Sequence, residues 1–388
     1  MRKPLIRPTN LVVVAFQRKK DFRNALSKQR TDWTPPGSLM GAISNNDTTY
    51  EVWKGKLDNP LVKQLFLRMQ GLVPMFIEGG TPIISEEAHA DDDRWTFYFL
   101  YQKNLVDDQT DYVFCGVCTV YRFWAMFPPT EPLESPSKVA ERLEKFDLAK
   151  EDFDLSTLPC RSRISQFIVL PAFQGRGLGS KFYETIYREL LGHEPTREIT
   201  VEDPNEAFDD MRDICDLRFL RQQAGFHALH INTSIKPPKK GWAPKNIVDP
   251  DAKEAVRRKY KIAPRQFARL VEMQLMSKLP ESVRPGVVPP EESSTASKAT
   301  EEEKHELSLW KLLLKIRIHQ SNLDALGELE IPERIAKLDE TVSSVAFDYA
   351  RLLAQADRYE TKRNGKRKAD DYNGDVVMGS DAKKVRMC

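Results

Sequence analysis

The chain has 388 residues, of which 40% are hydrophobic and 30% are charged, and its formal net charge is +2. No apolar run approaches the length of a membrane-spanning helix, and the run at residues 11–16 is too short for the core of a signal peptide. Five cysteines are few and odd in number, which argues against a disulfide-stabilised secreted protein. We therefore expect a soluble intracellular protein of two or three domains without membrane contact.

The first part of the chain begins with a basic segment at residues 1–36 and then alternates between strand and helix signals. Residues 48–55 predict a strand, and four apolar residues between 61 and 72 recur at helical spacing. Further strand signals, rich in aromatic and β-branched residues, lie at residues 75–80, 94–103 and 111–127. These runs predict a β-meander.

Residues 128–160 are charged and contain several prolines. Such a segment predicts a surface insertion, for which a solvated loop is favoured over a substrate contact. A strand is then predicted at residues 164–170, followed by a glycine-rich loop and a helix at residues 178–191, whose apolar positions recur at i+4 steps. A second short strand is predicted from residue 198, ending at Glu202 and Asp203.

The loop at residues 174–180 has the sequence QGRGLGS. Because N–H groups at a helix N-terminus lack helical partners and favour anions, this arrangement predicts a diphosphate-bearing ligand. A Walker loop requires Gly-Lys-Ser/Thr, whereas Ser180 precedes Lys181 here. A dinucleotide fingerprint requires G-x-G-x-x-G, and these glycines have the wrong spacing. The pattern that fits, Gln-x-x-Gly-x-Gly, resembles the pyrophosphate loop of the GCN5-related N-acetyltransferases.

Two further segments, RISQF at residues 163–167 and ITVEDPN at residues 199–205, narrow this resemblance. Together with the loop they resemble the catalytic subunit of type B histone acetyltransferases, in a form similar to that of filamentous fungi. The resemblance implies an α/β (α+β) chain with the GCN5-related N-acetyltransferase fold, a mixed and mostly antiparallel sheet flanked by helices, plus a C-terminal helical domain. It also implies a longer N-terminal domain, of which residues 1–74 would be a shortened remnant.

The same resemblance implies acetyl-CoA as co-substrate and no metal. A pantetheine arm would pair with the edge of the strand, and glycines would let the loop backbone approach phosphate. The residues that match the family's coenzyme contacts are Phe167, Ile168, Val169, Gln174, Gly175, Arg176, Gly177, Leu178, Gly179, Ser180, Asn205 and Phe208. For Phe208, an alternative is that it belongs to the core.

Acetyl transfer to lysine needs a base, because an amine with a pKa of about 10.4 is almost fully protonated near neutral pH. The resemblance favours Glu202 as this base, with Asp203 and Glu78 as helpers or substitutes. Alternation along a strand sends Glu202 and Asp203 to opposite faces, so only one can face the thioester. A competing interpretation makes Asp203 a helix N-cap, with Pro204 at the first helical position.

Four residues match positions that contact the histone H4 tail in the family: Trp95, Tyr121, Arg122 and Phe123. Aromatic faces and carboxylates suit a lysine-rich peptide, and the acidic run at residues 91–93 adds negative potential. The alternative is that Tyr121 and Phe123 merely line the sheet. The Cys115-x-x-Cys118 spacing suggests zinc, but it lies inside a strand pattern without a second cysteine pair, which disfavours a metal site.

The sequence divides into a basic N-terminal segment and domain remnant, an acetyltransferase core, a helical domain, a disordered linker, a pair of amphipathic helices and a disordered basic tail. The predicted bounds are 1–74, 75–225, 226–280, 281–304, 305–360 and 361–388. Basic clusters at residues 362–368 and 383–386 resemble a bipartite nuclear-import signal, and a nonspecific nucleic-acid patch is the rival interpretation. We expect the protein in both cytoplasm and nucleus, without specific nucleic-acid binding.

The resemblance implies direct acetyl transfer from acetyl-CoA to lysines in the tail of free, newly synthesised histone H4. The resemblance implies a WD40-repeat histone chaperone as partner, and roles in chromatin assembly, silencing and DNA repair. One rival is a small-amine or polyamine N-acetyltransferase, which the aromatic and acidic meander disfavours. The other is a histone-binding scaffold without catalysis, which the retained glycines and Glu202 disfavour.

Overall fold

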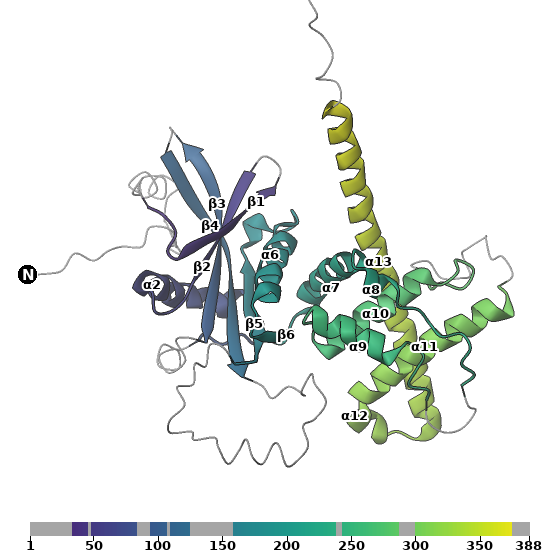
Figure 1. Cartoon of the computed structure of the whole chain (residues 1–388). Coiled ribbons are helices and arrows are strands. Elements are labelled where there is room, and N and C mark those ends of the chain that lie inside the picture. Colours follow the sequence, from purple (N-terminus) through teal and green to yellow (C-terminus); the bar gives the residue numbers. More distant parts are fainter. Residues whose placement is uncertain are drawn as a thin grey trace, which may run out of the picture. The chain divides into compact units, whose positions relative to one another are not determined.

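The computed structural model describes residues 33–45, 48–83, 94–106, 109–124, 158–237, 243–286 and 299–374 (Figure 1). Four of the sequence predictions fall on residues or side chains that the structure does not describe. They concern the basic N-terminus, the acidic run at residues 91–93, nearly all of the insertion and the basic clusters of the tail. The chain divides into two compact units. Unit 1 comprises Met1–Phe208 and Arg257–Ala263, and unit 2 comprises Asp209–Val256 and Pro264–Cys388.

Unit 1 contains a six-stranded sheet with the order β1-β2-β3-β4-β5-β6. Its strands are β1 (Ser38–Asn45), β2 (Thr48–Gly55), β3 (Trp95–Val106), β4 (Gln109–Trp124), β5 (Cys160–Val169) and β6 (Thr196–Val201). Strands β1 to β5 are antiparallel to their neighbours, whereas β6 runs parallel to β5. This arrangement confirms the predicted mixed, mostly antiparallel sheet of an α/β acetyltransferase fold.

Helices cover both faces of this sheet, because β3 sends alternate side chains to opposite sides. On one face, Phe97 packs against Phe66 of α2 (Pro60–Met69), with ring centroids 4.4 Å apart, and both rings are fully buried. On the other face, the Tyr98 hydroxyl donates a hydrogen bond to Glu189 of α6 (Leu178–Gly192). Burial of each phenyl ring contributes roughly 1.5–3 kcal/mol, so apolar packing holds α2 on the sheet, whereas the bond from Tyr98 joins α6 to the opposite face.

Residues 75–80 do not form the strand that we expected. After η1 (Gln70–Leu72), α3 (Val73–Phe76) ends in a turn in which the Gly80 N–H donates to the Ile77 carbonyl at 3.0 Å. Proline in the first turn of α3 suits a helix start, and Gly79 has a φ of +67°, which glycine adopts without strain. A short apolar run cannot distinguish a strand from a buried helical turn, which explains the wrong prediction.

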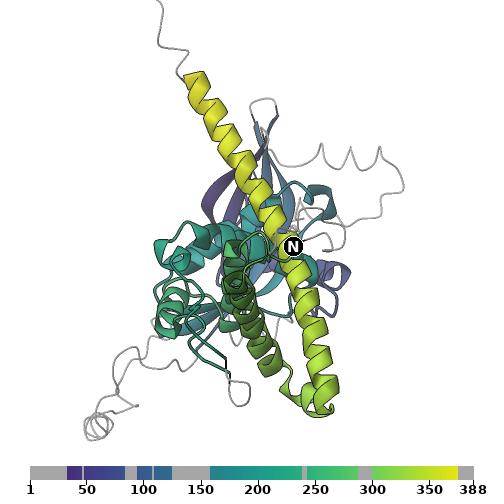
Figure 2. The ribbon, with the colours of Figure 1, turned by 90° about the vertical axis from the view of Figure 1, so that its right-hand side faces the viewer.

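Unit 2 is helical, as the sequence predicted for the C-terminal region. Its helices are α7 (Glu206–Arg221), whose first residues belong to unit 1, α8 (Ala224–His227), α9 (Pro250–Lys259), whose end belongs to unit 1, α10 (Pro264–Lys278), α11 (Glu301–Ser321), α12 (Leu323–Gly327) and α13 (Ile331–Gly374). Helices α11 and α13 lie side by side and α12 joins them (Figure 2).

Two helix boundaries in unit 2 differ from those predicted. Helix α11 begins inside the segment that we interpreted as a linker, because Thr300 and Glu303 form a capping box with bonds of 2.8 and 3.2 Å. Helix α13 continues to Gly374, beyond residue 360, where the sequence predicted the pair of amphipathic helices to end. No helix in the described ranges is both long and apolar enough to cross a membrane.

A buried carboxylate joins three helices of unit 2. Glu272 of α10 accepts bonds of 2.7 and 3.0 Å from Arg317 of α11, and a bond of 2.8 Å from the Tyr349 hydroxyl of α13. Burial raises the pKa of Glu272, and the hydrogen bond from Arg317 acts in the opposite direction. Removal of one partner from such a buried pair typically costs about 3–5 kcal/mol, because it leaves the other charge buried and unpaired.

Candidate active site

The site begins where β5 and β6 part. Their parallel ladder ends at the pair Ile164 and Val201, and the Glu202 N–H donates one further bond to the Ile164 carbonyl at 2.9 Å. Strand β5 continues to Val169 in register with β4. The β6 side of residues 165–169 therefore lies beyond the β5–β6 ladder. An extended ligand can pair with such a strand edge through its amide groups.

The glycine-rich loop adopts backbone conformations that favour glycine. Gly175 and Gly177 have φ values of +75° and +73°, and Gly177 is the N-cap of α6 without a side-chain capping bond. A Cβ atom at either glycine would meet nothing within 4 Å, so the constraint is the backbone angle rather than the space. The Gln174 side chain donates to the Val169 carbonyl at 2.7 Å and so ties the loop to the end of β5.

An aromatic cluster connects the two parts of the predicted coenzyme site. Phe167 of β5 lies 5.2 Å from Phe182 of α6 and 5.1 Å from Phe208 of α7, measured between ring centroids. The structure thus brings Phe167 and Phe208 together, as the sequence predicted. In contrast, Ile168 faces the opposite side of the sheet and belongs to the core there, so its remaining contact with a ligand is through the backbone.

The residue that caps α7 is Asn205 and not Asp203. The Asn205 side chain accepts a hydrogen bond from the Phe208 N–H at 2.9 Å, and α7 begins at Glu206. This geometry contradicts the N-cap interpretation of Asp203 with Pro204 at the first helical position. Asp203 instead has a φ of +34°, in the left-handed region that few residues other than glycine adopt. Asp203 therefore forms the sharp turn that leads out of β6.

Glu202 is an exposed carboxylate at the end of β6. Its side chain is 45% exposed and lies 3.7 Å from the Arg163 guanidinium. Glu78 is also exposed and lies in the turn after α3. The segment that follows this turn is held to β5, because the Gln166 amide donates to the Thr81 carbonyl at 3.3 Å. Two of the three candidate bases thus belong to exposed turns attached to β5.

Three of the four predicted substrate residues form one strip. Trp95 of β3 lies 4.8 Å from Tyr121 of β4, and Tyr121 lies 6.2 Å from Phe123, measured between ring centroids. The Arg163 guanidinium lies over the Phe123 ring at 4.7 Å and pairs with Glu202. We call these five residues the aromatic strip. It leads from the meander to the candidate base.

Arg122 is not part of the aromatic strip. It lies between Tyr121 and Phe123 in β4, so strand alternation sends its side chain to the opposite face. Burial lowers the pKa of His193 there, and the charge of Arg122 lowers it further. Burial raises the pKa of Tyr98 well above its usual range, and the charge of Arg122 only acts in the opposite direction. The position of Arg122 on the α6 side of the sheet separates it from the other predicted substrate residues.

Sequence reasoning missed two arginines at this end of the sheet. Arg163 is described above, and Arg94 donates to the Tyr121 hydroxyl at 2.9 Å and lies 4.3 Å from the ring centre of Trp124. The sequence contained a weak signal for Arg163. It alternates with buried residues of β5, a pattern that places its side chain on the less buried face of that strand. Both guanidinium groups lie over aromatic rings, on which they can stack.

The CxxC pair consists of buried thiols. Burial raises the pKa of Cys115 to about 12 and raises that of Cys118 well above its usual range. Across the described ranges there is no group of three or more His, Cys, Asp or Glu side chains arranged to hold a metal ion.

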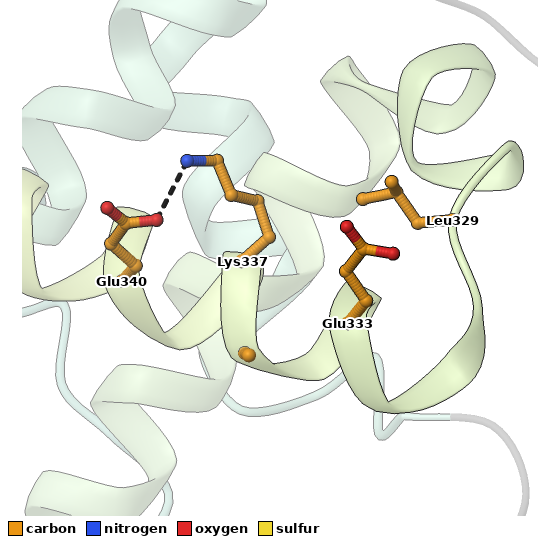
Figure 3. A pocket seen from close by; sticks show the side chains of 5 residues that line it. Leu329, Glu333, Lys337 and Glu340 are labelled. Atoms are coloured by element: carbon orange, nitrogen blue, oxygen red, sulfur yellow. Dashed lines mark hydrogen bonds and ion pairs between the residues drawn. The ribbon is translucent and has the colours of Figure 1, made fainter.

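A hollow of about 610 Å³ lies far along the chain from these residues, in unit 2 (Figure 3). It is lined by Leu329, Glu333, Ala336, Lys337 and Glu340. Lys337 and Glu340 pair with each other at 2.7 Å and are both exposed. We assign this surface groove no chemical role, because its lysine is already paired with a carboxylate of the same lining.

Comparison with known proteins shows the family to which this chain belongs. Two family models match it, "Histone acetyl transferase HAT1 N-terminus" at residues 5–78 and "Fungal HAT1, C-terminal" at residues 213–280. Three relatives share the name "Histone acetyltransferase type B catalytic subunit". The Neurospora crassa protein is 51% identical over 89% of this chain and 70% of its own length. The Gibberella zeae protein is 46% identical, over 93% and 76%. The Pyricularia oryzae protein is 43% identical, over 96% and 78%. This chain therefore belongs to the family of type B histone acetyltransferase catalytic subunits, which are acyltransferases.

Proposed function

We propose that this chain transfers the acetyl group of acetyl-CoA directly to a lysine amine in the N-terminal tail of free, newly synthesised histone H4. The observation that supports this most is the aromatic strip, which ends at Glu202 where β5 and β6 part. Rings that can hold an ammonium group thus lead to a carboxylate that can take its proton.

The coenzyme would lie along β5 and the glycine-rich loop. The β6 side of residues 165–169 offers backbone groups to an amide-containing arm, and the loop at residues 174–180 offers N–H groups to a pyrophosphate. The positive φ angles of Gly175 and Gly177 fit this role, since they allow successive N–H groups to converge on an anion. Phe167 and Phe208 provide apolar contact beside the strand edge.

Glu202 acts as the base in this proposal. It takes a proton from the lysine ammonium, and the neutral amine then forms the new C–N bond while the C–S bond of the thioester breaks. The sulfur leaves as a thiolate, which takes up the second proton that the nitrogen loses. A backbone N–H on the edge of β5 would stabilise the negative charge that develops on the acetyl oxygen.

Glu202 is favoured over the other carboxylates by its surroundings. It contacts Arg163, which stacks on Phe123, so it belongs to the aromatic strip. The left-handed backbone of Asp203 indicates a conformational role for that residue. Glu78 would assist from the turn after α3.

Membership of the family also supports proposals about partners and location. We infer a WD40-repeat histone chaperone that delivers histone H4, and roles in chromatin assembly, silencing and DNA repair. The basic clusters of the tail support import into the nucleus from the cytoplasm. Removal of residues 362–388 is then expected to confine a fluorescent fusion to the cytoplasm, and an unchanged nuclear signal would exclude these clusters as the import signal.

The substrate proposal is tested by labelled acetyl transfer with the purified full chain. Free histone H4, assembled nucleosomes and spermidine are compared at equal concentration. Strong labelling of free histone H4 alone is the expected result. Preference for spermidine would indicate a small-amine acetyltransferase, and coenzyme binding without transfer to any of the three would indicate a scaffold.

A further inference from the structure

A side chain from the first strand of the sheet supports the glycine-rich loop. Asn45, at the end of β1, is only 9% exposed, and its Nδ2 donates to the Arg176 carbonyl at 3.1 Å. Lys181, in the first turn of α6, donates from Nζ to Asn45 Oδ1 at 2.9 Å and to the Ser44 carbonyl at 2.8 Å. We call these residues, Ser44, Asn45, Arg176 and Lys181, the loop brace. It joins parts of the chain more than 130 positions apart.

The loop needs such a restraint because it contains two glycines in the left-handed region, on either side of Arg176. Glycine is the residue with the most backbone freedom, so an unsupported loop of this kind samples many conformations. Each conformation that turns an N–H away from the ligand lowers the affinity of the loop for an anion. A bond to the Arg176 carbonyl, which lies between these glycines, removes much of that freedom.

The brace also fixes where one N–H group points. The peptide bonds of the described residues are trans, and in a trans peptide the carbonyl of one residue and the N–H of the next point in opposite directions. Because the Arg176 carbonyl points to Asn45, the Gly177 N–H points away from β1. That N–H belongs to the N-cap of α6, where the helix dipole also favours an anion.

We propose that Asn45 and Lys181 are positioning residues for coenzyme binding, and that they orient the pyrophosphate loop before the coenzyme arrives. This inference rests on the proposal that the loop holds the pyrophosphate of acetyl-CoA. It gives the N-terminal strands a role in the reaction, although neither side chain needs to touch the coenzyme. Lys181 follows the glycines, as the lysine of a Walker loop does, but here it donates hydrogen bonds to the Ser44 carbonyl and the Asn45 side chain.

The experiment measures the dissociation constant of CoA by calorimetry for the full chain and for Asn45→Ala and Lys181→Met variants. Each substitution is expected to weaken CoA binding about 5- to 30-fold, because the loop brace loses polar contacts of about 1–2 kcal/mol. The KM for histone H4 should not change. The double variant should bind no more weakly than the stronger single effect, since both residues act through one brace.

A matched control comes from the other end of the same strand. The Ser38 hydroxyl donates to the Lys54 carbonyl at 3.3 Å in an exposed position, so Ser38→Ala removes a β1 side-chain bond without affecting the loop. This variant should bind CoA as the unaltered chain does. Thermal unfolding of all variants identifies general loss of structure, and if Asn45→Ala does not fold, Lys181→Met decides the question.

A Gly177→Val variant separates the role of the loop brace from the assignment of the loop to the pyrophosphate. A β-branched residue cannot adopt the φ of +73° found at Gly177 without strain, so this variant distorts the loop itself. Weak CoA binding by Gly177→Val, together with unchanged binding by folded Asn45→Ala and Lys181→Met, would overturn the brace and leave the loop assignment intact. Unchanged binding by all three would overturn both.

Discussion

The coenzyme half and the substrate half of unit 1 are built in different ways. Most of the coenzyme half is one continuous segment, in which β5, the glycine-rich loop and α6 follow each other along the chain, and α7 adds Phe208 to it. The substrate half collects single side chains from β3, β4, β5 and the end of β6. The first half therefore depends on local backbone geometry and core packing, and the second depends on strand register.

The largest expected difference concerns stability. Phe182 is fully buried in the coenzyme half and packs against Phe167, so Phe182→Ala should lower the free energy of unfolding by about 3–5 kcal/mol. Phe123 is partly exposed on the aromatic strip, and Phe123→Ala should cost about 1 kcal/mol or less while raising the KM for histone H4. Chemical denaturation and initial-rate kinetics check the pair. Equal losses of stability would mean that the strip is part of the core.

A smaller effect is expected at the turn that carries Glu202. Asp203→Ala should reduce kcat about tenfold, because an alanine at a φ of +34° adds strain of about 1–2 kcal/mol and shifts the turn. Asp203→Gly removes the same carboxylate but accepts the backbone angle, so it should retain most of the activity. If both variants lose activity equally, the Asp203 carboxylate takes part in the chemistry.

The ion pair of Glu202 should have a modest effect on turnover. Arg163→Gln is expected to lower kcat about two- to fivefold, since a partly exposed pair at 3.7 Å contributes less than about 1 kcal/mol. Arg163→Lys should restore part of this loss, whereas the KM for acetyl-CoA should stay constant. Arg161→Gln is the matched control, because Arg161 also lies over Phe123 but pairs with Glu198. A loss in the control as large as that for Arg163 would exclude a specific role for Arg163.

The smallest effect is a pH dependence at the end of α6. Burial lowers the pKa of His193, and the positive charge of Arg122 lowers it further. Between this lowered value and the unfolded value of about 6.5, the unfolded chain binds the extra proton, so stability should fall as the pH drops below about 6.5. Melting temperatures of the unaltered chain and of His193→Asn between pH 7.5 and 5.5 check this. Parallel pH profiles for the two proteins would contradict it.

The difference between the coenzyme half and the substrate half also explains which features the sequence could predict. The strand expected at residues 164–170 and the helix expected at residues 178–191 match β5 (Cys160–Val169) and α6 (Leu178–Gly192) closely, because spacing and glycine position act locally. Arg163 in the strip and Asn45 in the loop brace were missed, since their roles arise from contacts across strands. Local ambiguity also misled the prediction of residues 75–80, which form a helical turn.

Arg122 and the cap of α7 show how far local sequence patterns can predict the position of a site residue. The alternation of β4 contained the information that Arg122 faces away from Tyr121 and Phe123, but the family resemblance grouped all three. The sequence led us to consider Asp203 as the cap of α7, whereas the hydrogen bond from the Phe208 N–H shows that the cap is Asn205. Only the three-dimensional turn, with its positive φ at Asp203, distinguishes them.

The most direct test of the proposed mechanism is single-turnover acetylation of free histone H4 by a Glu202→Gln variant, measured together with its affinity for acetyl-CoA. The substitution keeps the size of the side chain but removes the base. We expect the rate of transfer to fall about 100-fold or more while coenzyme affinity remains unchanged. A rate equal to that of the unaltered chain would contradict the account and move the base to Glu78 or Asp203.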